Sequence, residues 1–179
     1  ASLSKTLANK EISDLVSALG CGIGPKFDIK KLRYGRIVIL TDADSDGHHI
    51  ATLLLTFFYR HLPDLIRGGN IYLGRPPLYR VQVGQAMYWA WDDRELGRVI
   101  EKHKGRAKPE TTRFKGLGEM SPQQLKETTL DPRTRTLLRV LITDELETDR
   151  TVNELMGRDA SSRYTFVMER ANEADDLDI

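Results

Sequence analysis

Hydrophobic residues in the first half of the chain follow two different periods. Residues 37–40 are a short run of β-branched and aliphatic side chains, Ile-Val-Ile-Leu, which predicts a buried strand. Residues 47–67 carry apolar side chains at helical spacing, and two glycines follow, so a long helix is expected. A second strand is predicted at residues 70–73. The order strand, helix, strand is a βαβ crossover, which implies a parallel pair in an α/β fold.

Shorter patterns lie on either side of this unit. Residues 1–24 are predicted to form one packing helix that ends in a glycine-rich turn. Residues 78–83 and 87–91 alternate as in a hairpin, with Gly84 in the turn, and residues 92–103 have a helical pattern. The hairpin carries several aromatic side chains, which fill a core more often than they stack on bases.

The last third of the chain is predicted to be mostly helical. Two short helices are expected to begin at Ser121 and Asp131, each with proline at the first helical position, and two longer ones to cover residues 145–156 and 161–174. We therefore divide the chain into residues 1–119, a sheet flanked by helices that includes the hairpin at 77–92, and residues 120–179, a helical tail region.

Three carboxylates follow the first predicted strand at alternate positions. They are Asp42, Asp44 and Asp46, and Gly47 comes next. Ligands of open α/β sheets bind at the carboxyl ends of strands. Three anions within five residues repel one another unless a cation lies among them, and hard oxygen ligands suit Mg²⁺. The pattern favours a metal site.

Three other interpretations compete for the acidic stretch. A plain turn after a strand also favours Asp and Gly. A calcium loop of the D-x-D-x-D-G type requires a glutamate at its twelfth position and a preceding helix, whereas this chain has Leu53 and a strand there. Phosphatases with a strand-end D-x-D nucleophile usually carry Thr or Val where this chain has Asp46.

Charge and composition narrow the remaining functions. The 179 residues are 30% charged with a net charge of only +1, so overall charge does not indicate a nucleic-acid binder. Residues 94–115, however, hold eight basic against three acidic residues, a local balance of +5. Phosphate contact is expected most at Arg113 and Lys115, which lie next to glycines that allow close backbone approach. A compensating acidic stretch covers residues 173–178.

Cysteine and hydropathy bear on where the protein works. Cys21 is the single cysteine, so an intrachain disulfide is excluded, which fits a reducing cytoplasm. No apolar run reaches the length of a membrane span, so no membrane association is expected.

Several longer blocks carry a family resemblance. They are LRYGRIVILTDADSDGHHIATLLLTFFYRH, GGNIYLGRPPLYRV and RFKGLGEMSPQQLKETTLDP, in that order. The acidic stretch resembles the D-x-D-x-D-G motif of the Toprim domain, and the set resembles the B subunits of bacterial type IIA DNA topoisomerases, gyrase or topoisomerase IV. The short spacer between the last two blocks and the sequence DADSDG favour topoisomerase IV, although other segments are equally similar to gyrase.

The resemblance implies a function and a set of partners. Asp42 and Asp44 would be the main Mg²⁺ ligands, for one or two ions, with Asp46 in support. His49, Arg113 and Lys115 would contact double-stranded DNA, whereas His48 is expected to cap or pack the helix. A partner A subunit would supply the tyrosine nucleophile within an A₂B₂ assembly, and ATP would bind in an amino-terminal domain outside this chain. The expected location is the bacterial cytoplasm, on the nucleoid.

The chain also departs from that family. The upstream E-G-D-S motif, whose glutamate is a metal ligand and acid–base residue, and the P-L-R-G-K segment do not occur here. We therefore assign no catalytic residue, and expect a piece that begins inside the Toprim domain and does not cleave DNA alone. The alternatives are a non-catalytic module that binds DNA and its partner protein, or a fragment of another Toprim-type nuclease or primase.

Overall fold

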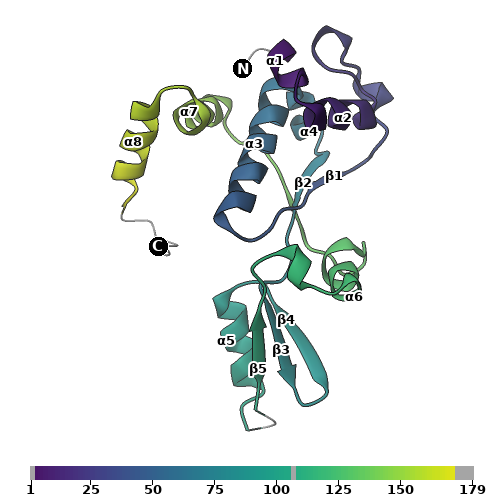
Figure 1. Ribbon diagram of the computed structural model, residues 1–179, viewed down its shortest axis with the longest axis vertical. Coiled ribbons are helices and arrows are strands. Elements are labelled where there is room, and N and C mark those ends of the chain that lie inside the picture. The colour runs from purple at the N-terminus through teal and green to yellow at the C-terminus, as the bar shows by residue number, and fades with distance from the viewer. Residues whose placement is uncertain (1–2, 106–107, 172–179) are drawn as a thin grey trace. The chain divides into compact units, whose positions relative to one another are not determined.

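The computed structural model describes residues 3–105 and 108–171. It divides into two compact units, residues 1–140 and residues 141–179, and each is described by itself (Figure 1). The domain boundary expected after residue 119 stays a prediction, although residues 120–140 belong to the first compact unit. In the described part of the chain, no helix is long and apolar enough to span a membrane.

A three-stranded sheet forms the centre of the first unit. Its order is β1 (Ile37–Ile39), β2 (Ile71–Gly74) and β6 (Leu137–Arg139). Strands β1 and β2 are parallel, as the βαβ pattern predicted, with Ile37 paired with Ile71, and this confirms the α/β class. The antiparallel strand β6 was not predicted, and it makes the sheet mixed.

The crossover between β1 and β2 consists of two helices where one was predicted. They are α3 (Ser45–His61) and α4 (Pro63–Arg67). Pro63 lacks the amide hydrogen that a continuous helix would need, so the chain breaks at Leu62 and restarts with proline at a first-turn position. Fully buried side chains around this break form the core: Phe58, Leu62, Leu65 and Ile71.

The amino-terminal region also contains two helices instead of the single one predicted. They are α1 (Leu3–Leu7) and α2 (Lys10–Leu19), followed by the 3₁₀ turns η1 (Gly24–Lys26) and η2 (Ile29–Lys31). The Asn9 side chain accepts a hydrogen bond from the Ile12 amide at 3.0 Å, so it caps α2 and separates the two helices.

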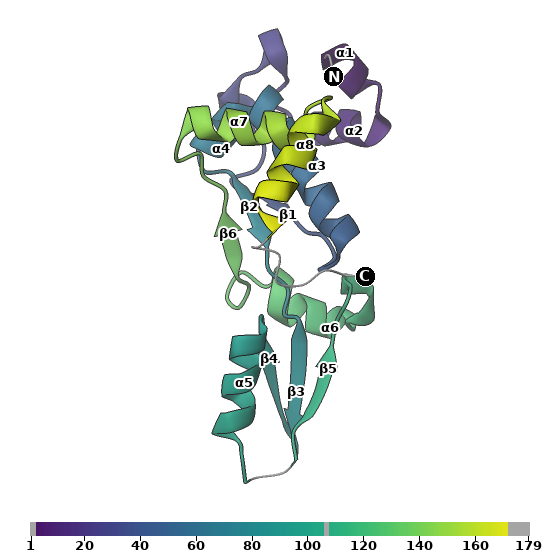
Figure 2. The same ribbon diagram turned by 90° about the vertical axis from the view of Figure 1, so that its left-hand side faces the viewer.

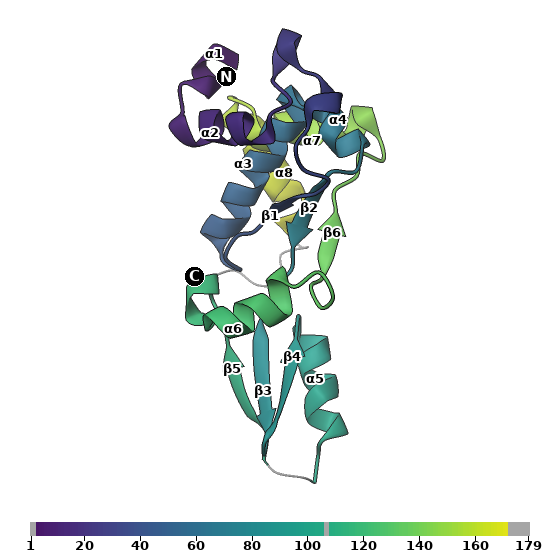
Figure 3. The same ribbon diagram turned by 90° about the vertical axis from the view of Figure 1, so that its right-hand side faces the viewer.

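A second, antiparallel sheet follows β2. The predicted hairpin is confirmed as β3 (Tyr79–Val83) and β4 (Ala86–Ala90), and α5 (Asp93–Lys102) runs along its β4 side (Figures 2 and 3). Strand β5 (Glu110–Arg113) pairs with the other side of β3 and was not predicted, because all four of its residues are polar and exposed.

Aromatic side chains of this sheet pack on protein partners. The Trp89 ring lies 6.3 Å from the Phe114 ring, and the Tyr88 ring lies 4.3 Å from the His103 ring, between centroids. The Trp91 indole donates a hydrogen bond to the Arg75 carbonyl at 2.9 Å. These contacts agree with the interpretation that the aromatics stabilise the fold.

The segment after β5 turns back to the first sheet through η3 (Leu117–Glu119), α6 (Pro122–Leu125) and the π-helical turn η4 (Lys126–Leu130). Ser121 is the predicted cap of α6, and it forms a reciprocal capping box with Gln124. The short helix predicted at Asp131 is wrong. The Asp131 carboxylate accepts the Arg133 amide as an N-cap would, and also the Arg133 side chain, but the chain forms only a turn there before β6.

The second unit is a pair of helices, α7 (Glu145–Met156) and α8 (Ala160–Glu169). The predicted break at Gly157 is confirmed, because α7 ends at Met156 and Gly157 is its C-cap. A Cβ atom at Gly157 would lie 2.1 Å from the Asn153 carbonyl oxygen. The prediction that the second helix continues to residue 174 is wrong, because α8 ends at Glu169 with Arg170 as its C-cap. The acidic stretch at 173–178 and Arg106 of the cationic region lie outside the described residues.

The Asp131 turn generates a pH-dependent prediction. Hydrogen bonds from the Arg133 side chain, then from the Arg133 amide, lower the pKa of Asp131 to about 2. Because the pKa of an unfolded aspartate is about 3.9, the contact stabilises the folded chain above about pH 4 and is lost as the pH falls through about 2. We expect carboxyl-carbon NMR to show a titration midpoint near 2 for Asp131.

Replacing Arg133 by Met should raise that midpoint towards the ordinary value, because it removes the first cause of the shift. Arg135→Met is the matched control, since the Arg135 guanidinium contacts the Leu130 carbonyl instead of the carboxylate. A wild-type midpoint near 4 would contradict the assignment.

Candidate metal centre

The acidic stretch lies where the parallel strands end. Strand β1 ends at Ile39 and β2 at Gly74, so the residues that follow them meet at one edge of the sheet. Asp42, Asp44 and Asp46 are all solvent exposed there.

Asp44 has a structural role in addition to its predicted role as a metal ligand. It is the N-cap of α3, and its Oδ1 accepts a hydrogen bond from the Gly47 amide at 2.7 Å. The aspartate fills the cap position, so the capping alternative expected for His48 is wrong, while its packing alternative stays a prediction. Gly47 is required here because a Cβ atom would lie 2.1 Å from the Asp42 carbonyl oxygen, so the helix start packs directly on the backbone of the acidic turn.

The Asp42 carboxylate is held by a distant segment. Its Oδ1 accepts a hydrogen bond from the Leu117 amide at 2.8 Å, across 75 positions of sequence. Gly116 lies against the same carboxylate, since a Cβ atom there would be 3.1 Å from Asp42 Cγ and Oδ2. The structure thus brings the acidic stretch together with the Gly-Leu-Gly turn that follows the cationic region.

That turn is closed by its own contacts. The Glu119 carboxylate accepts a hydrogen bond from the Lys115 amide at 2.9 Å, and the Glu119 amide donates to the Gly116 carbonyl at 3.2 Å. Phe114 before the turn and Met120 after it are buried. We refer to residues 114–120 as the glycine loop.

A cavity of about 240 Å³ adjoins Asp42. His48 and Arg75 contribute polar groups to its wall, whereas His49 is not part of the lining. The Arg75 guanidinium is 3.3 Å from the Asp92 carboxylate and is thereby held near the strand ends. The Glu95 amide, and then Arg75, lower the pKa of Asp92, so this partner remains charged.

The donor set fits Mg²⁺ better than Ca²⁺. Among the described residues, no three His, Cys, Asp or Glu side chains gather as metal ligands, whereas Ca²⁺ needs six to eight oxygens. Mg²⁺ is usually held by one or two carboxylates, with water and substrate phosphates completing its shell. Within the described chain, Oδ2 of Asp42 and Oδ2 of Asp44 have no hydrogen-bond or ion-pair partner, so each can face a cation.

The predicted DNA-contacting residues lie in different places. Arg113 ends β5 and Lys115 lies in the glycine loop, both exposed and both close in sequence to Gly116 beside Asp42. His49 is exposed, as the fifth residue of α3. The other basic side chains of the cationic region are mainly on α5, which runs along the opposite side of the second sheet from β5 (Figure 3).

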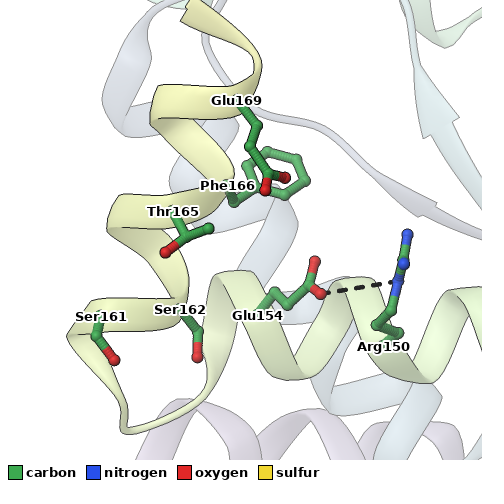
Figure 4. A pocket seen from close by; sticks show the side chains of 7 residues that line it. All are labelled: Arg150, Glu154, Ser161, Ser162, Thr165, Phe166 and Glu169. Atoms are coloured by element: carbon green, nitrogen blue, oxygen red, sulfur yellow. Dashed lines mark ion pairs between the residues drawn. The ribbon is translucent and has the colours of Figure 1, made fainter.

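Two further cavities lack a comparable organisation. One of about 370 Å³ lies between α7 and α8, with serine and threonine hydroxyls and an Arg150–Glu154 ion pair of 3.7 Å in its wall (Figure 4). The other, of about 540 Å³, lies beside α6 and the Asp131 turn. Neither adjoins a strand end or an unpaired acidic group of the acidic stretch.

Sequence reasoning missed three contributors to the site. His48 and Arg75 line the cavity, and the Leu117 amide binds Asp42. Arg75 lies inside a block that carries the family resemblance, which is the signal that could have indicated it. Leu117 contacts Asp42 through its backbone amide, so the identity of the residue at position 117 does not indicate this contact in the sequence.

Comparisons with known proteins match both halves of the chain. A family model described as the Toprim domain matches residues 1–76, and one described as the carboxyl terminus of the DNA gyrase B subunit matches residues 106–168. The chain is 51% identical over 178 residues to the DNA gyrase B subunit of Thermotoga maritima and 49% identical over 179 residues to that of Archaeoglobus fulgidus. It is 49% identical over 178 residues to the DNA topoisomerase 4 B subunit of Bartonella bacilliformis.

These matches cover 98–100% of this chain but only 26–28% of the three relatives, so the chain spans little more than a quarter of their length. Relatives from both enzymes match almost equally well, so the preference for topoisomerase IV stays a prediction. Both family models match in the expected order, and about half of all residues are identical to these relatives. The chain therefore belongs to the family of type IIA topoisomerase B subunits, and it matches their Toprim-containing, carboxyl-terminal part.

Proposed function

We propose that this chain forms the Mg²⁺-binding portion of a DNA cleavage and religation centre in an ATP-dependent type IIA topoisomerase. The observation that carries the proposal is the placement of Asp42 and Asp44 at the carboxyl ends of a parallel strand pair, each with one carboxylate oxygen free of described partners. Family membership supports the same function.

Reversible DNA cleavage transfers a phosphoryl group to a protein hydroxyl and back. A tyrosine oxygen bonds to phosphorus, the bond from phosphorus to a deoxyribose oxygen breaks, and the tyrosine proton passes to the departing oxygen. Mg²⁺ held by Asp42 and Asp44, with Asp46 in support, would stabilise the negative charge that develops on the phosphate oxygens. Asp42 and Asp44 orient the ion, while Arg113 and Lys115 contact neighbouring phosphates.

The nucleophile comes from outside this chain in the proposed mechanism. Tyr79, for example, is buried and donates its hydroxyl to the Asp93 carboxylate at 2.7 Å, which suits a structural role. A partner A subunit would supply the attacking tyrosine in an A₂B₂ complex on double-stranded DNA. ATP would act at a domain that lies outside these residues, and the complex would work in the cytoplasm on the nucleoid.

Metal binding is the first test of this function. We expect wild-type chain to bind Mn²⁺, used as a probe for Mg²⁺, more tightly than the Asp42→Asn/Asp44→Asn variant in calorimetric titration. Asparagine is chosen at position 44 because it preserves the helix cap, whereas alanine would cost about 0.5–2 kcal/mol of stability. Asp64→Asn is the control for a lost charge, since Asp64 lies on α4 and pairs with Arg67. Equal heats from wild type and the double variant would remove the metal assignment.

DNA cleavage itself requires the rest of the enzyme. Residues 1–179 can replace the matching stretch of the Thermotoga maritima DNA gyrase B subunit, which is assayed with its A subunit, ATP and plasmid DNA. We expect Mg²⁺-dependent supercoiling by the chimera, and a loss of more than about 100-fold in Asp42→Asn, since even outer partners of metal ligands are worth 10–100-fold.

The Asp64→Asn chimera should keep its activity. Full activity of the Asp42→Asn chimera would favour the second candidate function, a module that positions DNA and its partner protein without binding a catalytic ion.

Phosphate contacts give a prediction about salt. Each lost contact should reduce the slope of log K against log salt by about 0.9. For Arg113→Ala/Lys115→Ala we therefore expect a slope flatter by roughly one to two units in fluorescence anisotropy with duplex DNA, and no change in sequence preference.

The control is Arg94→Ala/Arg98→Ala, which removes the same charge from α5. It should change the slope less, because α5 is on the opposite side of the second sheet from β5. An equal change in both variants would mean that binding responds to net charge alone.

A further inference from the structure

The two oxygens of the Asp42 carboxylate have different surroundings. Oδ1 accepts the Leu117 amide hydrogen at 2.8 Å, whereas no described residue forms a hydrogen bond or ion pair with Oδ2. The backbone of the same residue is fixed from the other side, where Gly47 at the start of α3 leaves no room for a Cβ atom beside the Asp42 carbonyl. Asp42 is therefore constrained at both its main chain and its side chain.

We propose that the glycine loop is a positioning element for the metal centre. The Leu117 amide holds Oδ1 of Asp42 and thereby turns Oδ2 towards the cation, and Gly116 provides the space that this approach needs. This inference rests on the proposed function, because it assigns a role in metal binding to a loop that supplies no ligand itself.

The loop is built to hold a backbone amide in place. Glu119 closes it by accepting the Lys115 amide, and the buried side chains of Phe114 and Met120 attach its two ends to the fold. Outer partners that orient metal ligands commonly contribute 10–100-fold to metal affinity. A donor from the main chain suits this task because it has no side-chain rotamers to restrict.

The loop also places the predicted phosphate-binding residues. Lys115 immediately precedes Gly116, and Arg113 lies two residues further back at the end of β5. The contact between Leu117 and Asp42 thus connects the cationic side chains to the carboxylate. One short segment therefore carries both the Leu117 amide and the Lys115 side chain.

Leu117→Pro removes the proposed donor with little change elsewhere. Leu117 is the first residue of a 3₁₀ turn, where proline is tolerated, and Gly116 before it is extended at φ −147° and ψ 162°, as a residue preceding proline prefers. Leu117→Ala is the matched control, because it removes the leucine side chain but keeps the amide hydrogen. We expect Leu117→Pro to bind Mn²⁺ about 10- to 100-fold more weakly than wild type, and Leu117→Ala to bind it like wild type.

The two glycines of the loop provide a second pair. A methyl group at Gly116 would press on the Asp42 carboxylate, whereas one at Gly118 would meet nothing within 4 Å. Gly116→Ala should therefore weaken Mn²⁺ binding, and Gly118→Ala should leave it unchanged. Thermal unfolding of all four variants shows whether each remains folded.

A readout without metal separates this inference from the proposed function. In the ¹H–¹⁵N spectrum of the metal-free chain, Asp42→Ala should shift the Leu117 amide resonance and speed its hydrogen exchange, while Asp46→Ala should do neither. Failure of that response would overturn the positioning contact even if Mn²⁺ binds.

Mn²⁺ binding distinguishes the remaining outcomes. If Asp42→Asn/Asp44→Asn binds Mn²⁺ as well as wild type, the metal function fails, and the positioning of a metal ligand fails with it. If that double variant binds weakly but Leu117→Pro binds as tightly as Leu117→Ala, or more tightly, the metal function stands and the positioning role is overturned.

Discussion

The rest of the site depends on the contacts that hold Asp42, at both its backbone and its side chain. Gly47 brings the first turn of α3 against its carbonyl, and the glycine loop brings an amide to its carboxylate. The first approach requires a residue without a side chain, because a Cβ atom at Gly47 would lie 2.1 Å from the Asp42 carbonyl oxygen, and a Cβ atom at Gly116 would press on the Asp42 carboxylate at 3.1 Å. The sheet edge, the helix start and the loop that follows the last strand of the second sheet therefore meet at one residue. A single exposed hydrogen bond adds little net stability, so the main effect of this arrangement is on geometry.

The local elements of the first unit could be read from the sequence because their patterns are periodic or chemically distinct. The run at residues 37–40 gave β1, and the capping signals at Ser121 gave α6. The helix at 47–67 was placed correctly but not its break, because the apolar spacing continues through Pro63. Strand β5 carries no hydrophobic alternation, since it forms by pairing with β3 and not by burying a face. At Asp131 the capping hydrogen bond does form, since the carboxylate accepts the Arg133 amide, but the chain makes a single turn there and does not continue as a helix.

The candidate site could be predicted in part, because some of its residues form a chemically distinct pattern in the sequence. Three aspartates in alternation after a strand indicate where a cation would bind, and those residues carry the signal themselves. The partner of Asp42 carries no such signal, because every non-proline residue has a backbone amide. Only the tertiary fold selects the amide of Leu117, which lies 75 residues away in the sequence. His48 and Arg75 join the cavity through the crossover and the end of β2, which sequence spacing alone does not bring together.

The carboxylate oxygens of Asp42 and Asp44 have two uses: one oxygen of each accepts a backbone hydrogen bond, and the other is available to a cation. Asp44 uses one oxygen to cap α3 and Asp42 uses one to bind the glycine loop, so each retains one oxygen for a cation. A protein cage with more carboxylates would hold an ion more firmly but would leave fewer coordination positions for a phosphate oxygen. In reversible phosphoryl transfer the substrate must enter and leave the coordination shell of Mg²⁺, and an ion held by two carboxylates and water permits this exchange. The free oxygens of Asp42 and Asp44 are therefore compatible with the proposed chemistry, and the close approaches of Gly47 and Gly116 hold Asp42 in the position from which it can take part.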